Sequence, residues 1–357
     1  MRTQTGNAAL IDVLRSEIRN RGPQPFSWFM ERALYQPEHG YYSSGRCAIG
    51  RKGDYFTNVS VGPLFGQLMT AQFAEIWAQL GKIDKFVIVE QGANDGQFAR
   101  DVLESAQSRA PEFFEALDYR IIEPFPILRD LQSQMLERFR TKIRWRNSLE
   151  PFTGVHFSNE LLDAMPVRLI SGNTEKLVGL QGDRFVFIEC PVSSSASNHA
   201  ALVWIDNLAA NLKRGYVIAI DYGHSGNEFH GDVQVRAKHR HLDSPFELIG
   251  QADMTMHVDW TSIVRRAEAN GLAIGGFADQ HHFLIGIISE LSDREQSSLT
   301  DSPKAKRELQ TLLHPEMLGR AFQVLALAKN VDPTAWPLAG FKFAREPHSM
   351  LGLGPPN

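Results

Sequence analysis

The chain is poor in cysteine: only Cys47 and Cys190 occur among its 357 residues, and neither belongs to a C-x-x-C pair. A disulfide framework and a cysteine-based zinc site therefore have little support, and a reducing compartment is expected. The formal net charge is only -4, so no basic field favours nucleic acid as a partner. No run of about 18 apolar residues is present, which excludes a membrane-spanning helix. The N-terminus lacks the apolar core of a secretory signal, and the protein is expected to be cytoplasmic.

Short apolar runs alternate with helical patterns through much of the chain. Residues 85–90 are nearly all apolar and rich in β-branched side chains, which is typical of a strand buried on both faces of a parallel sheet. The alternation predicts a doubly wound α/β sheet. The further expected strands are 119–123, 143–146, 154–158, 216–220, 272–277 and 322–328, and the expected helices are 97–108, 126–139, 199–213, 259–270 and others around 303–320.

Four regions fall outside this alternation. Helical spacing over residues 8–20 and 26–34 predicts an N-terminal helical cover, followed by a surface loop and a helix over about 61–80. Residues 166–188 contain turn signals that predict an antiparallel excursion, and the polar stretch 222–258 predicts a long ordered loop or an insertion. The last dozen residues are expected to be a loose tail. We therefore expect a cover and site loop over 1–60 and a core over 61–357, with insertions near 166–190 and 222–258.

The first predicted strand ends in Val87-Ile-Val-Glu-Gln-Gly-Ala-Asn-Asp-Gly96, which places two glycines four positions apart before a helix. Small residues let the backbone approach a nucleotide, and the helix N-terminus adds exposed N–H donors. Glu123 ends the next strand, where a carboxylate can accept hydrogen bonds from ribose hydroxyls. Together these features predict an adenosine ligand that contacts Gly92, Asn94, Gly96 and Glu123.

The glycine turn lacks the third glycine of the dinucleotide pattern, since Ala99 and Arg100 stand there. Asp95 beside the turn would repel a pyrophosphate but suits a ligand with a sulfonium and an ammonium group. S-adenosyl-L-methionine is therefore favoured over NAD, and a nicotinamide-dependent oxidoreductase is the less favoured reading. Five histidines, at 239, 241, 257, 281 and 282, match no metal-ligand spacing, so no metal site is expected.

Eight ordered segments resemble the mitochondrial dysfunction protein A (MidA)-like methyltransferase family, which includes complex I assembly factor 7. The matching segments are Tyr41-Tyr42, Gly53 to Thr57 with Phe65-Gly66, Glu90 to Gly96, Glu123-Pro124, Asn159 to Pro166, Ile220 to Gly223, Ala252 to Asp259 and Gly319 to Phe322. The resemblance implies a Rossmann-like class I methyltransferase core with an inserted, substrate-facing region. It also implies cofactor contacts from Asp54, Thr57, Glu90, Asp95, Pro124 and Asn159, and a protein arginine as the methyl acceptor.

Carboxylates at other strand ends are candidates for the acceptor site. Glu160 and Asp163 follow the strand 154–158, and paired carboxylates could orient a guanidinium for attack on the methyl group. The alternative is that they cap the next helix. Asp221 ends another apolar strand and either faces the acceptor or anchors the following loop. His257 could assist proton removal, although a structural histidine is commoner.

Two departures from the family pattern weaken the inference about the substrate. Asn58-Val59-Ser60 stands where the family has Ser-Pro-Glu, and Gly92 to Gly96 replaces a Gly-Pro-Gly-Arg-Gly turn. We therefore keep a small-molecule or peptide acceptor as an alternative to a protein arginine. A noncatalytic assembly factor that retains the cofactor pocket is a further alternative. The sequence does not determine the oligomeric state.

Overall fold

The computed structural model describes residues 5–45, 57–192, 197–226 and 232–354. Two compact units divide the chain. Unit 1 comprises Met1–Phe56, Leu162–Val203 and His230–His257, and unit 2 comprises Thr57–Leu161, Trp204–Phe229 and Val258–Asn357. Unit 1 thus combines the N-terminal segment with most of both predicted insertions, while the boundary expected after residue 60 stays a prediction.

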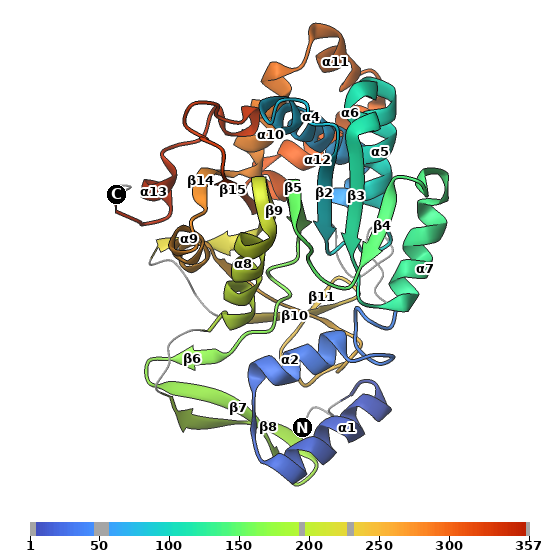
Figure 1. The fold of residues 1–357 in the computed structure, drawn as a ribbon. Coiled ribbons are helices and arrows are strands. Elements are labelled where there is room, and N and C mark those ends of the chain that lie inside the picture. The colour runs from blue at the N-terminus through green and yellow to red at the C-terminus, as the bar shows by residue number, and fades with distance from the viewer. Residues whose placement is uncertain (1–4, 46–56, 193–196, 227–231, 355–357) are drawn as a thin grey trace. The chain divides into compact units, whose positions relative to one another are not determined.

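Unit 2 is built on an eight-stranded sheet with the order β14-β15-β9-β5-β2-β3-β4, and β13 pairs with β9 (Figure 1). The strands β9, β5, β2, β3 and β4 are parallel, whereas β15 runs antiparallel to both of its neighbours. The strands are β2 (Phe86–Gln91), β3 (Leu117–Ile122), β4 (Ile143–Arg146), β5 (Phe152–Asn159), β9 (Leu212–His224), β13 (Val258–Asp259), β14 (Ala273–Asp279) and β15 (Phe322–Lys329).

Helices cover both faces of this sheet (Figure 1). On one face, the apolar side chains of alternate strand residues, such as Phe86, Ile88 and Tyr119, join the main core. On the other face, Trp204 of α8 packs on His156 and Trp260 of α9 packs on Phe277. The first face is covered by α4 (Leu64–Gln79), α5 (Gln97–Arg109), α6 (Pro111–Ala116), α10 (Gln280–Glu290) and α12 (Pro303–Leu313), and the second by α8 (His199–Asn211) and α9 (Trp260–Ala269).

The strand order reverses between β2 and β5, because the chain proceeds from β2 towards β3 and β4 and later returns to form β5 and β9. In open α/β sheets, ligands bind at the carboxyl ends of the strands beside such a reversal. The turn after β2 and the residues after β3, β5 and β9 therefore form the edge at which a site is expected.

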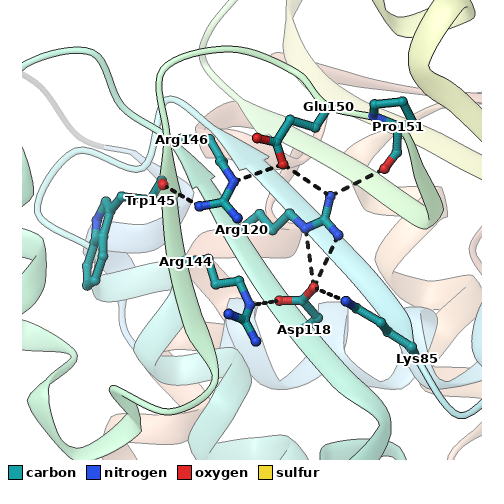
Figure 2. A network of polar contacts seen from close by, with 8 residues as sticks. All are labelled: Lys85, Asp118, Arg120, Arg144, Trp145, Arg146, Glu150 and Pro151. Carbon is teal, nitrogen blue, oxygen red and sulfur yellow. Dashed lines mark hydrogen bonds and ion pairs between the residues drawn. The ribbon is translucent and has the colours of Figure 1, made fainter.

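A network of charges stabilises the β3–β4 end of the sheet, on the face opposite the main core (Figure 2). The carboxylate of Asp118 lies 2.9 Å from Nε of Arg144, 3.2 Å from Nη2 of Arg120 and 3.3 Å from Nζ of Lys85. Burial favours a higher pKa for Asp118, but the charge of Arg120 and the hydrogen bonds from Arg144, Arg120 and Lys85 lower that pKa below its ordinary value. Asp118 is therefore an ionised anchor for three cations.

Among the described residues of unit 1 are two small antiparallel sheets and two complete helices. β7 pairs with β1, β6 and β8 in one sheet, and the order of the other is β11-β10-β12. Phe26, Phe29, Phe185 and Phe246 pack ring against ring in its core. The elements are α1 (Ala8–Arg21), β1 (Gln24–Pro25), α2 (Phe26–Tyr35), β6 (Leu169–Ser171), β7 (Thr174–Gln181), β8 (Arg184–Pro191), β10 (Val233–Ala237), β11 (Arg240–Leu242) and β12 (Asp253–Met256).

Two expectations about loops were wrong. The stretch 222–258 is not a long loop throughout, since it contains β10, β11 and β12; in β10, the buried Val235 and Ala237 alternate with exposed or half-buried residues. The C-terminal residues are not all a loose tail either. Leu351 is fully buried, and its carbonyl accepts a 2.7 Å hydrogen bond from the Thr261 hydroxyl.

The remaining elements are short segments, or helices that the sequence pattern did not predict or predicted with other bounds. Helix α10 was not expected, although its Phe283, Leu284 and Ile287 are buried in the main core. The other elements are α3 (Asn58–Val61), α7 (Pro126–Met135), η1 (Glu137–Phe139), α11 (Asp293–Ser298), η3 (Pro315–Gly319), η4 (Ala339–Phe341) and α13 (Pro347–Met350).

Candidate cofactor and acceptor site

The turn between β2 and α5 has a left-handed backbone at three alternate positions. Gly92, Asn94 and Gly96 have φ values of 86°, 46° and 86°. Glycine adopts this conformation at little cost, and asparagine is among the few other residues that tolerate it. A Cβ added at Gly92 would be in ordinary van der Waals contact with Leu161, at 3.4 Å, so the left-handed backbone rather than crowding favours glycine there. The predicted glycine turn therefore has the geometry of a cradle for a ligand.

Asp95, one residue before the N-cap Gly96, contacts the start of the helix that follows this turn. Its Oδ1 accepts a 3.1 Å hydrogen bond from the backbone N–H of Gln97, the first residue of α5. An acidic side chain is favourable at a helix N-terminus because it satisfies an exposed donor and complements the helix dipole. The carboxylate thus adds negative charge beside the turn, as the sequence predicted, and serves a structural purpose as well.

Glu90, at the end of β2, is buried beneath the turn. Only 3% of the residue is exposed, and its Oε2 accepts a 2.7 Å hydrogen bond from the hydroxyl of Tyr119. Burial raises the pKa of Glu90 to about 8, with a smaller contribution from the negative charge of Asp95, while the Tyr119 hydrogen bond opposes the rise. Glu90 is therefore held by β3, and a direct contact with the cofactor stays a prediction.

Glu123 follows β3 and is held at both carboxylate oxygens. Oε1 accepts a 3.0 Å hydrogen bond from the backbone N–H of Phe125, and Oε2 accepts a 3.1 Å bond from Nε2 of Gln132. Burial raises the pKa of Glu123, and these two hydrogen bonds and the charge of Arg129 oppose that rise. A carboxylate oriented in this way can accept hydrogen bonds from a ribose diol. Pro124 beside it is exposed.

Three side chains, at the end of β5 and at the start of α3, form a hydrogen-bonded chain. Nδ2 of Asn58 donates to Oδ1 of Asn159 at 2.8 Å, and Nδ2 of Asn159 donates to Oε1 of Glu160 at 2.8 Å. The backbone N–H of Asn58 also points to this Glu160 oxygen, at 3.4 Å. Glu160 has a φ of 54°, a left-handed backbone conformation that is strained for a residue other than glycine. Strain of this sort persists only where surrounding contacts impose it.

Thr57 forms a capping box with Ser60. The Thr57 hydroxyl accepts from the Ser60 backbone N–H at 3.1 Å, and the Ser60 hydroxyl accepts from the Thr57 backbone N–H at 2.9 Å. Ser60 occupies the position at which the family pattern has Glu, and Glu at this position completes the same kind of box. The start of α3 is therefore capped in spite of the substitution.

Asp221 lies three residues before the end of β9 and is almost completely buried, with 1% exposure. Its Oδ1 accepts a 2.8 Å hydrogen bond from the backbone N–H of Tyr222. Gly223 follows, and a Cβ at that position would lie 2.2 Å from Nε1 of Trp260. Of the two roles predicted for Asp221, these contacts describe the anchoring of the following residues, and a role towards the acceptor stays a prediction.

Asp163 and His257 belong to unit 1, whereas Glu160 and Asp221 belong to unit 2. The Asp163 carbonyl accepts a 2.8 Å hydrogen bond from Met256, and Nε2 of His257 lies 3.3 Å from Nε2 of Gln234. The proposed pairing of Asp163 with Glu160 and the proton-removal role of His257 stay predictions. Asp54 lies outside the described residues.

Sequence reasoning missed two buried amides of this site, Asn58 and Gln132, both of which are 0% exposed. Neither belongs to a recognisable motif, because an amide at a helix start or inside an amphipathic helix is ordinary. One signal was present: Gln132 interrupts the apolar face of α7, on which Leu128 is buried one turn earlier. A polar residue at a core position implies a buried hydrogen-bond partner.

Within the described residues, no group of three or more His, Cys, Asp or Glu side chains is placed to hold a metal ion. The same part of the chain contains no helix long and apolar enough to cross a membrane.

The chain is similar in sequence to known methyltransferases. The family model of S-adenosyl-L-methionine-dependent methyltransferases matches residues 68–201 and 189–278, which together span more than half of the chain. The mitochondrial protein arginine methyltransferase NDUFAF7 homolog of Drosophila melanogaster is 26% identical, over 95% of this chain and 90% of the relative. The mitochondrial protein arginine methyltransferase NDUFAF7 of Bos taurus is 25% identical, over 91% of this chain and 88% of the relative.

Two crystal structures of Burkholderia thailandensis proteins share the fold. One, bound to S-adenosyl-homocysteine, superposes with a TM-score of 0.85 at 28% identity and covers 96% of each chain. The other, a native structure, superposes with a TM-score of 0.81 at 27% identity and also covers 96% of each chain. The predicted α/β fold with a mostly parallel central sheet and the resemblance to the MidA-like family are confirmed by these comparisons.

Proposed function

Because this chain belongs to the S-adenosyl-L-methionine-dependent methyltransferase family, we propose that it methylates an arginine side chain of a protein. The chain is an enzyme, and S-adenosyl-L-methionine is its cofactor. The relatives named protein arginine methyltransferases support the choice of acceptor. The observation that carries the proposal is Glu160, a carboxylate held by two asparagines at the carboxyl edge of the sheet.

The residues of the site suit the cofactor. The left-handed backbone at Gly92 and Asn94 would lie along the cofactor, and Glu123 would accept hydrogen bonds from its ribose hydroxyls. The negative charges of Asp95 and Glu123 complement a ligand that carries a sulfonium and an ammonium group. When bound, the cofactor supplies an electrophilic methyl group. The protein's task is to place the acceptor nitrogen in line with that group and to exclude water.

Glu160 is suited to orient a guanidinium. Its Oε1 accepts from Asn159 and lies near the Asn58 N–H, so the carboxylate is fixed before a substrate arrives. A carboxylate can bind two guanidinium N–H groups side by side, and this restricts which nitrogen meets the methyl group. Its negative charge also favours the approach of a cationic acceptor and remains beside the nitrogen when the proton leaves.

The acceptor is tested with tritiated S-adenosyl-L-methionine and two matched peptide pools, one with a central arginine and one with a central lysine. We expect label on arginine only, identified as methylarginine after hydrolysis. Glu160→Gln should lower kcat on the arginine pool about 100-fold, because the amide cannot pair with a guanidinium, while the Kd of S-adenosyl-homocysteine changes little. Glu137→Gln, at an exposed carboxylate, is the control and should behave as wild type.

Other outcomes would favour the alternatives. Label transferred to a small molecule of a cell extract, with no label on either pool, would replace the arginine acceptor with a small-molecule acceptor. Cofactor binding with no turnover on any pool or extract would favour a noncatalytic assembly factor. An unchanged kcat in Glu160→Gln would refute the assignment of Glu160 but leave the acceptor open to identification from the label.

The subcellular location of this enzyme is a separate proposal. The names of the Drosophila melanogaster and Bos taurus relatives describe those proteins as mitochondrial, and we propose a cytoplasmic location for this chain from its sequence. Microscopy of the tagged full chain in its own cells would test it, and label confined to another compartment would contradict it.

A further inference from the structure

One buried side chain connects the two segments that the proposed function places around the cofactor. Nε2 of Gln132 donates to the carbonyl oxygen of Asn94 at 2.8 Å and to Oε2 of Glu123 at 3.1 Å. Asn94 is the left-handed residue in the centre of the turn after β2, and Glu123 follows β3. A single amide group thus contacts both the turn and the carboxylate.

The orientation of this amide is fixed by a third partner. Oε1 of Gln132 accepts a 2.8 Å hydrogen bond from Nε1 of Trp145, on β4. An indole N–H can only donate and a carbonyl can only accept, so the oxygen must face Trp145 and the nitrogen must face Asn94. Figure 2 shows the Trp145 ring on the opposite side of β4 from the guanidinium groups of Arg144 and Arg146. The strand alternation therefore directs the indole to Gln132.

All polar atoms of the Gln132 side chain are used within the protein, and the residue is 0% exposed. A buried amide costs free energy unless it is hydrogen-bonded, and an apolar residue would fill this position on α7 without that requirement. Leu128 and Leu136, one turn before and one turn after Gln132, are both buried apolar residues. Packing alone therefore gives no reason for an amide here.

We propose that Gln132 is a positioning residue for cofactor binding. Its side chain holds the turn at Asn94 and the carboxylate of Glu123 in one fixed arrangement. The inference rests on the proposed ribose contact of Glu123. Without the amide, the Glu123 carboxylate would keep the hydrogen bond from the Phe125 N–H but lose the one from Gln132, and the Asn94 carbonyl would lose its hydrogen bond from Gln132. Cofactor binding would then have to order both groups, and this ordering weakens affinity.

The first test compares Gln132→Leu with Gln134→Leu, an exposed glutamine of the same helix, as the matched control. Calorimetric titration with S-adenosyl-homocysteine should show affinity about tenfold weaker for Gln132→Leu, which corresponds to about 1.4 kcal/mol, and unchanged for Gln134→Leu. With saturating S-adenosyl-L-methionine, kcat on the peptide pool that is methylated should remain near wild type while the KM for the cofactor rises. A folded Gln132→Leu protein with wild-type affinity would overturn the proposal.

A ligand analogue separates positioning from general damage. Removal of both ribose hydroxyls from S-adenosyl-homocysteine should weaken binding to wild type about tenfold or more, but should weaken binding to Gln132→Leu only about threefold, because the carboxylate is no longer oriented. Equal losses in the two proteins would contradict a role through Glu123. Glu123→Ala separates the positioning role of Gln132 from the proposed ribose contact. If Glu123→Ala binds S-adenosyl-homocysteine as tightly as wild type, the ribose contact itself is refuted. If Glu123→Ala binds it weakly and Gln132→Leu does not, only the positioning role is refuted.

Gln132→Glu keeps the proposal testable if the leucine variant does not fold. The substitution places a second carboxylate next to Glu123, and two neighbouring carboxylates share a proton. Affinity for S-adenosyl-homocysteine should therefore be close to wild type at low pH and should fall about tenfold more than that of wild type as the pH rises past neutrality. A pH profile parallel to that of wild type would overturn the inference.

Discussion

Replacement of Asp118 by asparagine should destabilise the protein while leaving the cofactor site in place. Asp118 is 6% exposed and accepts hydrogen bonds from Arg144 at 2.9 Å and from Arg120 at 3.2 and 3.3 Å (Figure 2). Asparagine fits the same space but has no charge. Arg120, the buried cation, then retains as a counterion the more distant Glu150 carboxylate, 4.0 Å away, and this loss is costlier than the loss of an exposed ion pair.

The size of the effect follows from the exposure of the three cations. The side chains of Lys85 and Arg144 are 65% and 52% exposed, so each contributes about 0–1 kcal/mol. The Arg120 side chain is 12% exposed, and its paired hydrogen bonds to a charged acceptor contribute about 2 kcal/mol. We therefore expect Asp118→Asn to lower the free energy of unfolding by about 2–3 kcal/mol near neutral pH.

Urea-induced unfolding at a series of pH values provides the assay. The pKa of Asp118 lies below its ordinary value of 3.8 in the folded protein, so its contribution is fully present above that value and is lost as the pH falls through the lowered pKa. The difference between wild type and Asp118→Asn should thus be constant above about pH 5 and shrink below the ordinary pKa. Glu150→Gln, at a carboxylate that is 49% exposed, is the control and should cost about 0.5 kcal/mol or less. The reasoning fails if the two variants cost the same, or if the Asp118 effect persists in strong acid.

Two further predictions concern the residues around the glycine turn. Asn94→Gly should keep cofactor affinity and stability close to wild type. Asn94→Val should lower the free energy of unfolding by about 1–2 kcal/mol, because φ at this position is 46° and a β-branched residue is disfavoured there. Equal stabilities of the two variants in urea would contradict this prediction. The pKa of Glu90 is raised from 4.5 to about 8, so the folded state holds a proton that the unfolded state releases, and this contribution to stability declines as the pH rises from 4.5 to 8. Glu90→Gln should remove that decline, as measured by urea unfolding at pH values on either side of this range, and a pH dependence unchanged from wild type would refute the assignment.

The sheet of unit 2 could be predicted from the sequence because its strands are buried on both faces. Residues 86–91, for example, form an apolar run whatever packs on them, and the prediction of 85–90 is one residue away from β2. The glycine turn was predictable for a related reason: its left-handed positions restrict which residues can occupy them. Both signals are local, so a single sequence carries them.

Features that depend on distant partners could not be predicted. The strands β10 and β12 are short and half-polar, and Val235 and Met254 become adjacent only through antiparallel pairing across a segment of the chain that has no periodicity of its own. Helix α10 is apolar around much of its circumference and lacks the amphipathic spacing that marks a surface helix. The roles of Glu90 and Gln132 depend on Tyr119 and Trp145, which lie on neighbouring strands.

The two departures from the family pattern preserve the backbone of the site. Ser60 stands where the family has Glu and completes the capping box with Thr57, and Asn94 stands where the family has glycine and adopts the left-handed conformation. Both substitutions therefore satisfy the local requirement that the family residue would meet. What changes is the chemistry of the side chains: one carboxylate is lost from α3. Asn58, two residues earlier in the chain, instead contacts Asn159 and Glu160, so the remaining carboxylate of this cluster is held by neutral amides. A cationic acceptor would consequently depend on Glu160 for its orientation more heavily here than in family members that have two carboxylates. Replacement of Glu160 by glutamine is therefore the most informative single substitution at the acceptor site.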